Sequence, residues 1–375
     1  MLTSIRIQNF RSIRDASVKL GQVNLFIGPN NSGKSNFLKG IKLMSLCIHE
    51  LPATSLKQEL FSMLLPRKQN IKHVQDTIRI ISQTQQSNRK AISLIIGYNF
   101  DALQEERTFL ATEVEIIDDP ESSHRFSGYV ENAYGDEEQY FLPVEIRDLR
   151  IITSNSVVYK IEPASFNLSA TLSYEQRLSA TGSNVVNFLY NLSQNYKARF
   201  RALETDFARC VVNLVSVSIP ADPNQPGNLK LKFFDKNDVG YWAEEVSEGV
   251  LYFLALLCIV HQPDPPKLLL LEEPEKGIHP RRIREVMDFI FELAQLRGIQ
   301  IILTSHSPYV VDHFADIPEC ISVFDRENDE TVIRNAGDLI AESNAQLAAE
   351  GQPPIRYTDS LGEHWVSGFL GGVPA

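Results

Sequence analysis

The chain has 375 residues and a mass of 42.4 kDa, which is enough for two domains or for one large domain with an insertion. Its apolar fraction of 43% and charged fraction of 22% exclude disordered, collagen-like and fibrous repeat proteins. A net charge of −11 argues against a protein that coats nucleic acid through its overall charge.

Sequence features that relate to location point to the cytoplasm. The longest apolar run, Val250–Val260, is shorter than the roughly 20 residues that span a bilayer. Arg6, Asn9 and Arg11 occupy the region where a signal peptide carries its apolar segment. The four cysteines lie far apart, which predicts reduced thiols instead of disulfides or a zinc site. We therefore expect a cytoplasmic protein that makes no membrane contact.

The first fifty residues predict a strand, a turn, a second strand, a loop and a helix. Ser4–Phe10 alternates apolar and polar residues, which indicates a half-buried strand. Val23–Ile27 is a short, mostly apolar run that stops at Gly28, as a buried strand entering a loop does. Helical spacing begins at Lys34 and continues until Pro52.

The middle of the chain has a different pattern. Residues 53–92 look helical and polar, whereas residues 93–162 look like a meander of short strands separated by turn residues. Residues 183–215 are predicted to be helical, and Lys230–Phe234 with Val239–Trp242 to form a hairpin.

Strands and helices alternate again from residue 247 onwards. The predicted elements are a buried helix, a buried strand, an amphipathic helix, a second buried strand, a hairpin and a helix, at Val250–Val260, Lys267–Leu271, Pro280–Leu296, Gln300–Thr304, Cys320–Arg334 and Asp338–Glu350. A Gly-rich apolar tail follows. Alternation of this kind predicts an α/β fold.

Charge is distributed unevenly along the chain. Residues 1–45 contain seven Lys and Arg against one acid, and residues 66–90 contain six against one. Residues 101–148 contain three bases against fourteen acids, so that block is unsuited to bind nucleic acid. The two basic segments are candidates for DNA contact, although the plain interpretation of any single charged run is a solvated surface.

One motif between the second predicted strand and the first predicted helix matches G-x-x-x-x-G-K-[ST] completely. Its glycines let the backbone wrap around phosphates, and the free N–H groups at the helix start form an anion cradle. The lysine can reach the β- and γ-phosphates, and the last serine can ligate Mg²⁺. The predicted ATP-binding residues are Gly28, Pro29, Asn30, Asn31, Ser32, Gly33, Lys34 and Ser35.

Two carboxylates end a later buried strand, Leu268–Leu271. A metal-bound phosphate site needs one acid to hold Mg²⁺ or its water and a second to orient the attacking water. By their order, Glu272 takes the first role and Glu273 the second. A glutamate at 272 reaches about 1.5 Å further than an aspartate, so its metal contact is expected to differ.

Two further motifs complete the set. His306 ends another strand, 33 residues after Glu273, where an imidazole can hydrogen-bond a γ-phosphate or the hydrolytic water. Ser247, Glu248 and Gly249 begin the buried helix, and a helix N-terminus with a hydroxyl is a second anion site. Because the chain already has one phosphate cradle, a second one implies a composite site shared between two subunits.

Together, these motifs resemble those of ABC-type ATPase heads, in particular the branch of SMC, RecF and OLD-type proteins. The resemblance covers about residues 1–45 and 240–325, including the opening IRIQNFRSI. The segments that resemble the Walker A, signature, Walker B, D-loop and switch histidine of that family are Gly28–Ser35, Ser247–Gly249, Leu268–Glu273, Glu275–Pro280 and His306. The phrases EEPEKGIHP and TSHSP are most similar to bacterial OLD-type and related defence ATPases.

The resemblance implies an ABC-type head with a P-loop core sheet flanked by helices. Residues 1–45 and 171–375 would form this discontinuous head, and residues 46–170 an inserted helical and antiparallel β subdomain. ATP and Mg²⁺ would be the cofactors, with Ser35 and Glu272 as metal ligands and Glu273 and His306 as catalytic residues.

The sequence also departs from the family pattern. Its signature is a short Ser-Glu-Gly, and no Q-loop glutamine can be assigned. OLD-type nucleases carry a C-terminal Toprim domain with a D-x-D site, which the roughly 50 residues after the core lack. Asp325 and Asp329 are interpreted as turn residues of the hairpin. We therefore expect that this chain alone does not cut DNA.

Two functions remain open. The first is a nucleotide-gated homodimeric switch, in which Ser247–Gly249 contacts the partner's ATP and hydrolysis controls a separate nuclease or toxin in anti-phage defence. The alternative is a RecF- or SMC-like repair ATPase that binds DNA directly through residues 1–45 and 66–90. For the first function, a tail containing Trp365, Phe369 and Leu370 is a candidate docking strip for the effector.

Overall fold

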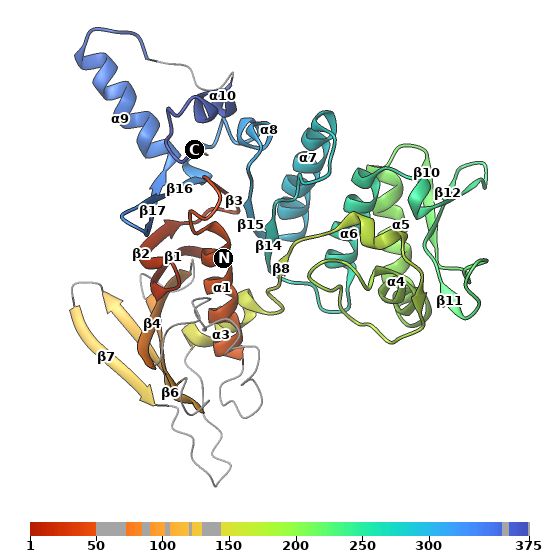
Figure 1. Ribbon diagram of the computed structural model, residues 1–375, viewed down its shortest axis with the longest axis horizontal. Helices are drawn as coiled ribbons and strands as arrows, with labels where there is room; N and C mark the ends of the chain where they lie inside the picture. Colours follow the sequence, from red (N-terminus) through yellow and green to blue (C-terminus); the bar gives the residue numbers. More distant parts are fainter. Residues whose placement is uncertain are drawn as a thin grey trace. The chain divides into compact units, whose positions relative to one another are not determined.

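The computed structural model describes residues 1–49, 73–84, 91–101, 106–119, 122–129, 144–354 and 360–373. They form two compact units (Figure 1). The first consists of Met1–Ser156 with Gln300–Ala375, and the second of Val157–Ile299. These units differ from the sequence-based division into a head, residues 1–45 and 171–375, and an insertion, residues 46–170. That division stays a prediction.

An antiparallel sheet forms part of the first unit. Its strand order is β2-β1-β4-β5-β6-β7, and every adjacent pair is antiparallel. The strands are β1 Leu2–Phe10, β2 Ile13–Lys19, β4 His73–Thr84, β5 Ala91–Asp101, β6 Glu106–Asp119 and β7 Ser122–Tyr129.

Strand β4 of this sheet corrects the sequence analysis. The predicted helical character of residues 53–92 is wrong for β4, which pairs with β1 on one side and β5 on the other. Ile78, Ile80 and Ser82 are buried at a spacing of two, as in a strand with one covered face. The remaining strands confirm the predicted antiparallel region.

A second, mainly parallel set of strands lies in the same unit. Strands β17, β16, β3 and β15 lie side by side in that order, with bounds Glu330–Asn335, Ile321–Glu327, Val23–Ile27 and Gln300–Thr304. Strand β3 is parallel to both β16 and β15, and it is buried along its whole length. Its polar residue, Asn24, is satisfied because its amide donates to Gly21 O and Ile301 O. The β16–β17 hairpin confirms the prediction.

Helix α1, Lys34–His49, joins the two sheets of the first unit. Its Phe37 ring contacts Phe26 of β3 and Phe324 of β16, with centroids 5.6 and 5.8 Å away. On the other side, a Cβ at Gly40 would lie 2.6 Å from Ile7 Cδ1 of β1. The helix start is therefore held rigidly where the P-loop motif ends.

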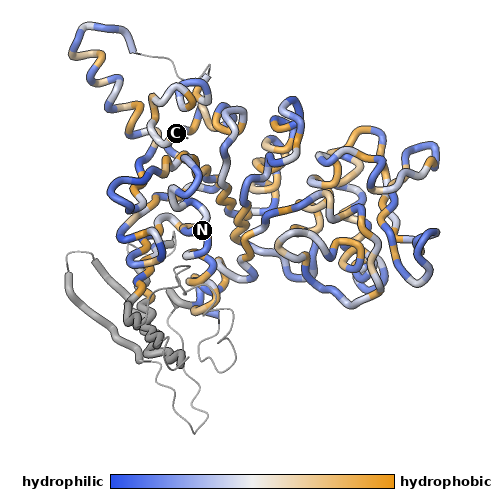
Figure 2. Tube along the Cα trace, viewed as in Figure 1, coloured by the Kyte–Doolittle hydropathy of each residue, from blue (hydrophilic) through white to orange (hydrophobic). Residues whose placement is uncertain are grey.

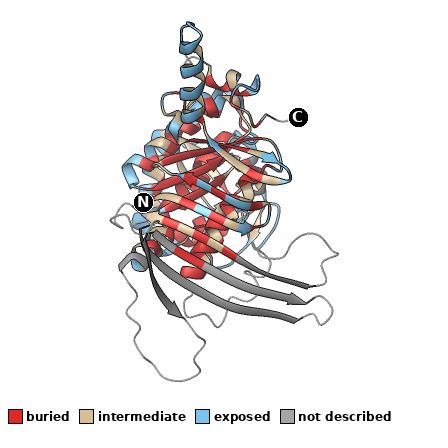
Figure 3. Ribbon diagram, turned by 90° about the vertical axis from the view of Figure 1, so that its left-hand side faces the viewer, coloured by how far each residue is buried: buried red, intermediate tan, exposed pale blue. Residues whose placement is uncertain are grey.

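The described residues of the first unit contain four more α-helices: α3 Val144–Thr153, α8 Pro308–Asp312, α9 Ala336–Ala349 and α10 Leu361–Val366. Helix α3 corrects the sequence analysis, which predicted a meander of short strands throughout residues 93–162. It packs on α1, where the Ser45 hydroxyl donates to Thr153 O at 2.7 Å. Figure 3 shows buried residues concentrated in the strands of this unit and exposed residues along α9.

The second unit combines α-helices with short strands and 3-10 turns. Its elements are β8 Val158–Tyr159, η1 Pro163–Asn167, β9 Ala170–Thr171, α4 Val185–Asn195, α5 Lys197–Cys210, β10 Leu214–Ser218, β11 Asn228–Leu229, β12 Lys232–Asp235, β13 Gly240–Trp242, η2 Ala243–Glu245, α6 Glu248–His261, β14 Leu268–Glu272 and α7 Pro280–Arg297. Strand β14 is parallel to β8, and β12–β13 is the predicted hairpin. Parallel strands combined with helices give the α/β fold that the sequence predicted.

Residue patterns explain why α6, β14 and α7, which carry or flank the signature and the carboxylate pair, form where they do. Helix α6 is apolar on all sides, and everything in it after Glu248 is buried. Strand β14 is coloured hydrophobic along its leucines (Figure 2). Helix α7 begins at Pro280 after the N-cap His279 and ends at Gly298, whose φ of 62° suits glycine. None of the helices in the described ranges is both long and apolar enough to cross a membrane.

The C-terminal tail contradicts the docking-strip expectation. Trp365 is 1% exposed and Leu370 is 2% exposed, so both belong to the core of the first unit. Gly362 N donates to Asp312 Oδ1 at 2.7 Å, which fixes α10 against α8. Of the three predicted docking residues, Phe369 alone is exposed, at 36%, beside the 56% exposed Val366. The tail is therefore part of the head's structure.

Replacing Gly362 by alanine should lower the free energy of unfolding by about 1–3 kcal/mol, the range for overpacking a filled site. A Cβ at this position would lie 2.3 Å from Pro308 O, so the backbone of α8 or α10 must shift. Chemical denaturation monitored by fluorescence measures the change. Glu363→Ala, on the exposed side of the same helix, is the control. Equal stability of the two variants would show that the tail is not packed as described.

Candidate functional site

The P-loop motif forms a phosphate cradle, residues 28–35, between β3 and α1. Two of its glycines have conformations that side chains rarely adopt, with φ of 142° at Gly28 and 111° at Gly33. A Cβ would lie 2.1 Å from Phe324 O at the first and 2.3 Å from Thr331 Oγ1 at the second. The cradle therefore lies directly against β16 and β17, and only glycine fits at either position.

Lys34 is the cation of this cradle. It is 5% exposed, and its Nζ donates to Gly28 O and Pro29 O at 2.8 Å each. The buried Ser32 Oγ beside it has no hydrogen-bond partner among the described residues. The loop thus combines a buried ammonium with a hydroxyl that is available to an acceptor. These are groups that an anionic phosphate requires.

His306 lies at the same edge of the parallel strands as the cradle. Strand β15 runs parallel to β3, with Thr304 opposite Phe26, so the residues after both strands emerge together. Ser305 N donates to Phe26 O at 3.1 Å, and the turn continues as Ser307 N donates to Ser305 Oγ at 2.9 Å. The structure therefore brings His306 and the cradle to one edge within the first unit, as the strand pattern predicts.

The carboxylate pair, Glu272 and Glu273, belongs to the second unit. Glu272 is the last residue of β14, and its Oε1 is 3.5 Å from Lys160 Nζ. Glu273 follows with a left-handed backbone, φ 51°, an uncommon conformation that occurs preferentially at functional sites. The chain turns sharply here, because Lys276 N donates to Glu273 O at 3.0 Å.

The signature residues stand at the start of α6. Ser247 occupies the N-cap position, and its hydroxyl makes no capping hydrogen bond to its own helix. Ser247 and Glu248 are exposed, whereas Gly249 is buried. An exposed hydroxyl beside the N–H groups of a helix start is free to meet an anion from outside. The Arg282 stem lies beside this turn, 3.6 Å from a Cβ built on Gly249.

The signature and the carboxylate pair meet within the second unit. A Cβ at Gly277, whose φ is 80°, would lie 2.5 Å from Glu248 Oε2. One helical turn later, the buried Tyr252 has a raised pKa, because of burial and because of the charge of Glu275. The first turn of α6 thus packs on the loop that carries Glu273. Sequence analysis included Gly277 in the D-loop segment Glu275–Pro280 but gave this glycine no role of its own.

A small open depression of about 160 Å³ lies where the start of α6 meets the loop after β14. Its lining includes Lys160, Glu248, Glu273, Lys276 and Gly277. Lys160, which follows β8, was not singled out from the sequence, because no motif contains it. Only the pairing of β8 with β14 places it beside the carboxylates.

The residues present suit ATP and Mg²⁺. The cradle meets the phosphate requirement, because its glycines leave space that a Cβ would fill and its lysine is buried in the loop. The oxygens of Ser35 and Glu272 are hard donors of the kind that Mg²⁺ prefers. The ammonium beside Glu272 shows that this carboxylate already accommodates a cation. Within the described part of the chain, no cluster of three His, Cys, Asp or Glu residues could hold a metal ion.

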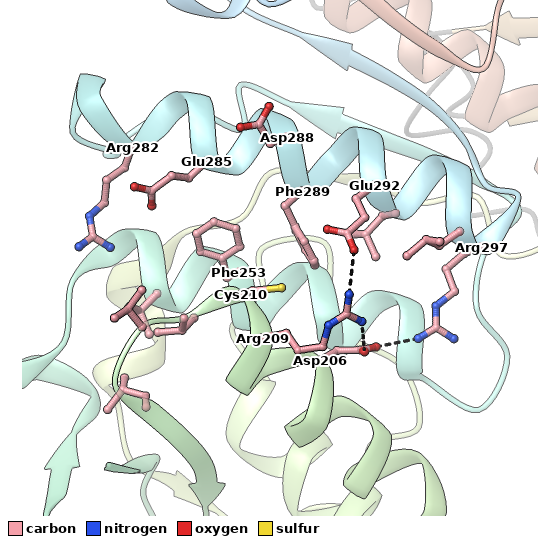
Figure 4. Close-up of a pocket in the computed structure, with 16 residues that line it drawn as sticks. Asp206, Arg209, Cys210, Phe253, Arg282, Glu285, Asp288, Phe289, Glu292 and Arg297 are labelled. Atoms are coloured by element: carbon pink, nitrogen blue, oxygen red, sulfur yellow. Dashed lines mark hydrogen bonds and ion pairs between the residues drawn. The ribbon is translucent and has the colours of Figure 1, made fainter. Parts of the chain in front are cut away.

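A larger cavity of about 690 Å³ lies elsewhere in the second unit, between α5, α6 and α7 (Figure 4). It contains none of the predicted site residues. Ion pairs within its own lining close one side: Arg209 to Glu292 at 3.3 Å and Arg297 to Asp206 at 2.8 Å. Its Cys210 is poorly reactive, because burial raises the thiol pKa to about 11.

The basic segments are only partly available for DNA. In residues 1–45, Arg6 pairs with Asp15, and Arg14 Nη1 lies 3.1 Å from Glu330 Oε1. Lys34 is committed to the cradle. Most of segment 66–90 and of the acidic block 101–148 lies outside the residues whose side chains are described. In the hairpin, Asp329 is a turn residue as predicted, whereas Asp325 belongs to strand β16.

Comparison with known proteins identifies a family. The family model described as "AAA domain, putative AbiEii toxin, Type IV TA system" matches residues 23–312. The chain is also 41% identical over 140 residues to the "Uncharacterized ABC transporter ATP-binding protein YhcH" of Bacillus subtilis (strain 168). That match covers 37% of this chain and 41% of the relative, so the chain aligns with less than half of that protein.

Solved structures with a similar fold include SMC heads. An SmcHead bound to the C-winged helix domain of ScpA has a TM-score of 0.51 at 13% identity, covering 89% of this chain and 96% of that one. An Smc head with an extended coiled coil, bound to the C-terminal domain of ScpA from Pyrococcus furiosus, has a TM-score of 0.51 at 11% identity. It covers 92% of this chain and 99% of that one. At such identities the likeness establishes the α/β head fold alone.

Proposed function

This chain belongs to the family of AAA domains described as "putative AbiEii toxin, Type IV TA system", and from that premise we propose that it is an ATP-hydrolysing, nucleotide-gated dimeric switch. The observation that carries the proposal is the glycine-built cradle with the buried Lys34 ammonium at its centre. A cation and helix N–H groups arranged in this way favour the β- and γ-phosphates of a nucleoside triphosphate.

Residue roles follow the order of the motifs. Lys34 holds the terminal phosphates, and Ser35 and Glu272 hold Mg²⁺, which when bound offsets phosphate charge. Glu273 accepts a proton from the attacking water, and His306, at the cradle's edge, hydrogen-bonds the γ-phosphate or that water. The strained backbone of Glu273 supports a functional role for it.

The dimeric part of the proposal depends on the signature. Ser247 presents an exposed hydroxyl that its own helix does not use. Two heads related by two-fold symmetry would each place Ser247, Glu248 and Gly249 against the partner's bound ATP. ATP would then close the dimer, and hydrolysis would reopen it.

Mixing two inactive variants tests the shared site. Ser247→Ala should bind ATP normally but not turn it over, because the partner's nucleotide loses its second anion site. Lys34→Ala should also be inactive, because its own cradle loses the cation that binds the phosphates, whereas its Ser247 remains intact. A heterodimer of the two contains one intact composite site, so mixing should restore about a quarter of wild-type turnover if subunits exchange randomly. Turnover is measured by phosphate release.

Thr205→Ala serves as the control partner, because Thr205 is exposed on α5, outside the signature and the cradle, and its hydroxyl donates to Arg201 O of the same helix at 2.9 Å. Mixed with Ser247→Ala, it should add only its own activity. No recovery in the mixture of Lys34→Ala and Ser247→Ala, with exchange confirmed by a tagged subunit, would contradict the shared site. ATP binding by neither wild type nor Ser247→Ala would contradict the nucleotide function itself.

We place this switch in bacterial anti-phage defence, as an OLD-like cytoplasmic ATPase. The family description, which refers to a toxin–antitoxin system, supports this reading. A separate nuclease or toxin would then be the partner that ATP turnover controls. Co-expression with products of neighbouring genes tests it: a stoichiometric complex whose nuclease or toxin activity changes with ATP is expected. DNA binding that stimulates ATPase without such a partner would favour the repair alternative.

A further inference from the structure

Lys160 stands directly opposite the carboxylate that the metal would use. Strands β8 and β14 pair in parallel, with Leu270 opposite Val158 and Leu271 opposite Tyr159. The next residues along the two strands are Glu272 and Lys160, and Lys160 Nζ lies 3.5 Å from Glu272 Oε1. The pairing register therefore creates this ion pair.

The surroundings hold the lysine in place. Lys160 N donates to Ala180 O at 2.8 Å, in addition to the pairing of the preceding Tyr159 with Leu271 of β14. The Lys160 side chain is 41% exposed and that of Glu272 only 16% exposed, so the ion pair is partly open to solvent. Lys160 lines the depression, whereas Glu272 ends the adjacent strand β14 and is not part of the lining. Glu162, Glu248, Glu273 and Lys276 are the other charged groups that line the depression.

We propose that Lys160 competes with Mg²⁺ for the Glu272 carboxylate, so that loading the metal requires breaking the Lys160–Glu272 ion pair. The inference rests on the proposed ATPase function. It adds a positioning residue, which holds the metal-binding carboxylate in place without itself touching the nucleotide. The lysine would keep the carboxylate ordered and neutralised until nucleotide and metal arrive together.

Charge repulsion is the physical reason for the competition. An ammonium at ion-pair distance from Glu272 repels a divalent cation that approaches the same carboxylate. Because the pair is partly exposed, solvent weakens it, and partly exposed ion pairs of this kind change an equilibrium by only a few-fold. The competition should therefore tune the metal concentration at which the site fills, without abolishing the reaction.

The experiment measures metal binding separately from turnover. Mn²⁺ is titrated into the full-length protein saturated with a non-hydrolysable ATP analogue, and free Mn²⁺ is followed by electron paramagnetic resonance. Lys160→Met should lower the Mn²⁺ midpoint about threefold, whereas Lys160→Arg should stay close to wild type. The difference between Lys160→Met and wild type should shrink at 1 M salt, where the Debye length falls to about 3 Å.

Lys267→Met is the matched control. It removes an exposed lysine just before β14, five residues from Glu272, which is about 16 Å along an extended strand. Its Mn²⁺ midpoint should equal that of wild type at physiological salt. An equal shift in Lys160→Met and Lys267→Met would show a general charge effect and overturn the proposal.

The remaining outcomes distinguish failure of the Lys160 competition from failure of the proposed ATPase function. An unchanged or higher midpoint in Lys160→Met overturns the competition while leaving the ATPase function standing. A fall in kcat at saturating metal, with the midpoint unchanged, also overturns it, because the lysine would then act on the phosphate. A wild-type protein that binds no Mn²⁺ with the ATP analogue refutes both the inference and the ATPase function.

Discussion

Replacing Lys34 by alanine should lower ATP turnover by about 100- to 1,000-fold, the typical loss when one preorganised charge-stabilising donor is removed. The ammonium is buried in the cradle and donates to two carbonyls at its entrance, so it is already oriented for phosphate. Among the described residues of the cradle, it is the sole cation. Steady-state phosphate release and binding of a fluorescent ATP analogue measure the effect.

Lys42→Ala is the matched control for this prediction. Lys42 is on the same helix, two turns after Lys34 and outside the motif. It should leave turnover close to wild type, and both variants should retain the wild-type thermal midpoint to within a few degrees. Turnover by Lys34→Ala at the wild-type rate would refute the P-loop assignment.

The phosphate half of the site could be predicted from sequence because its information is local. A strand, a glycine loop and a helix start are contiguous in residues 23–49, so the motif and its structural context are read together. The apolar strand β15 likewise predicted where His306 would emerge. Parallel pairing with β3 follows from that pattern once both strands are recognised as buried.

Features that depend on pairing between distant segments could not be predicted. Residues 73–84 look polar and helical alone, yet β1 and β5 provide partners that make them a strand. Lys160 became a site residue only through the register of β8 with β14. The aromatic tail looked like an interface, but Trp365 is covered by its own unit. In each case, tertiary contacts override a correct reading of local composition.

Replacing Glu273 by glutamine should reduce hydrolysis by about 100- to 10,000-fold while leaving ATP binding intact. The amide cannot accept the water's proton, but it has the shape of the carboxylate and suits the same left-handed backbone, φ 51°. The substitution therefore removes proton acceptance with little change of structure. Turnover and equilibrium binding of ATP separate the two effects.

The same variant should accumulate the closed dimer, because ATP that is bound but not cleaved keeps both composite sites filled. Light scattering with ATP should then show a dimer for Glu273→Gln, and a mainly monomeric protein when Lys34→Ala is combined with it. Glu272→Gln distinguishes the roles within the carboxylate pair, since it should raise the Mg²⁺ requirement without trapping the dimer. If Glu272→Gln traps the dimer and Glu273→Gln shifts the metal requirement, the two roles are reversed. The ion pair of Glu272 with Lys160 would then no longer oppose the metal.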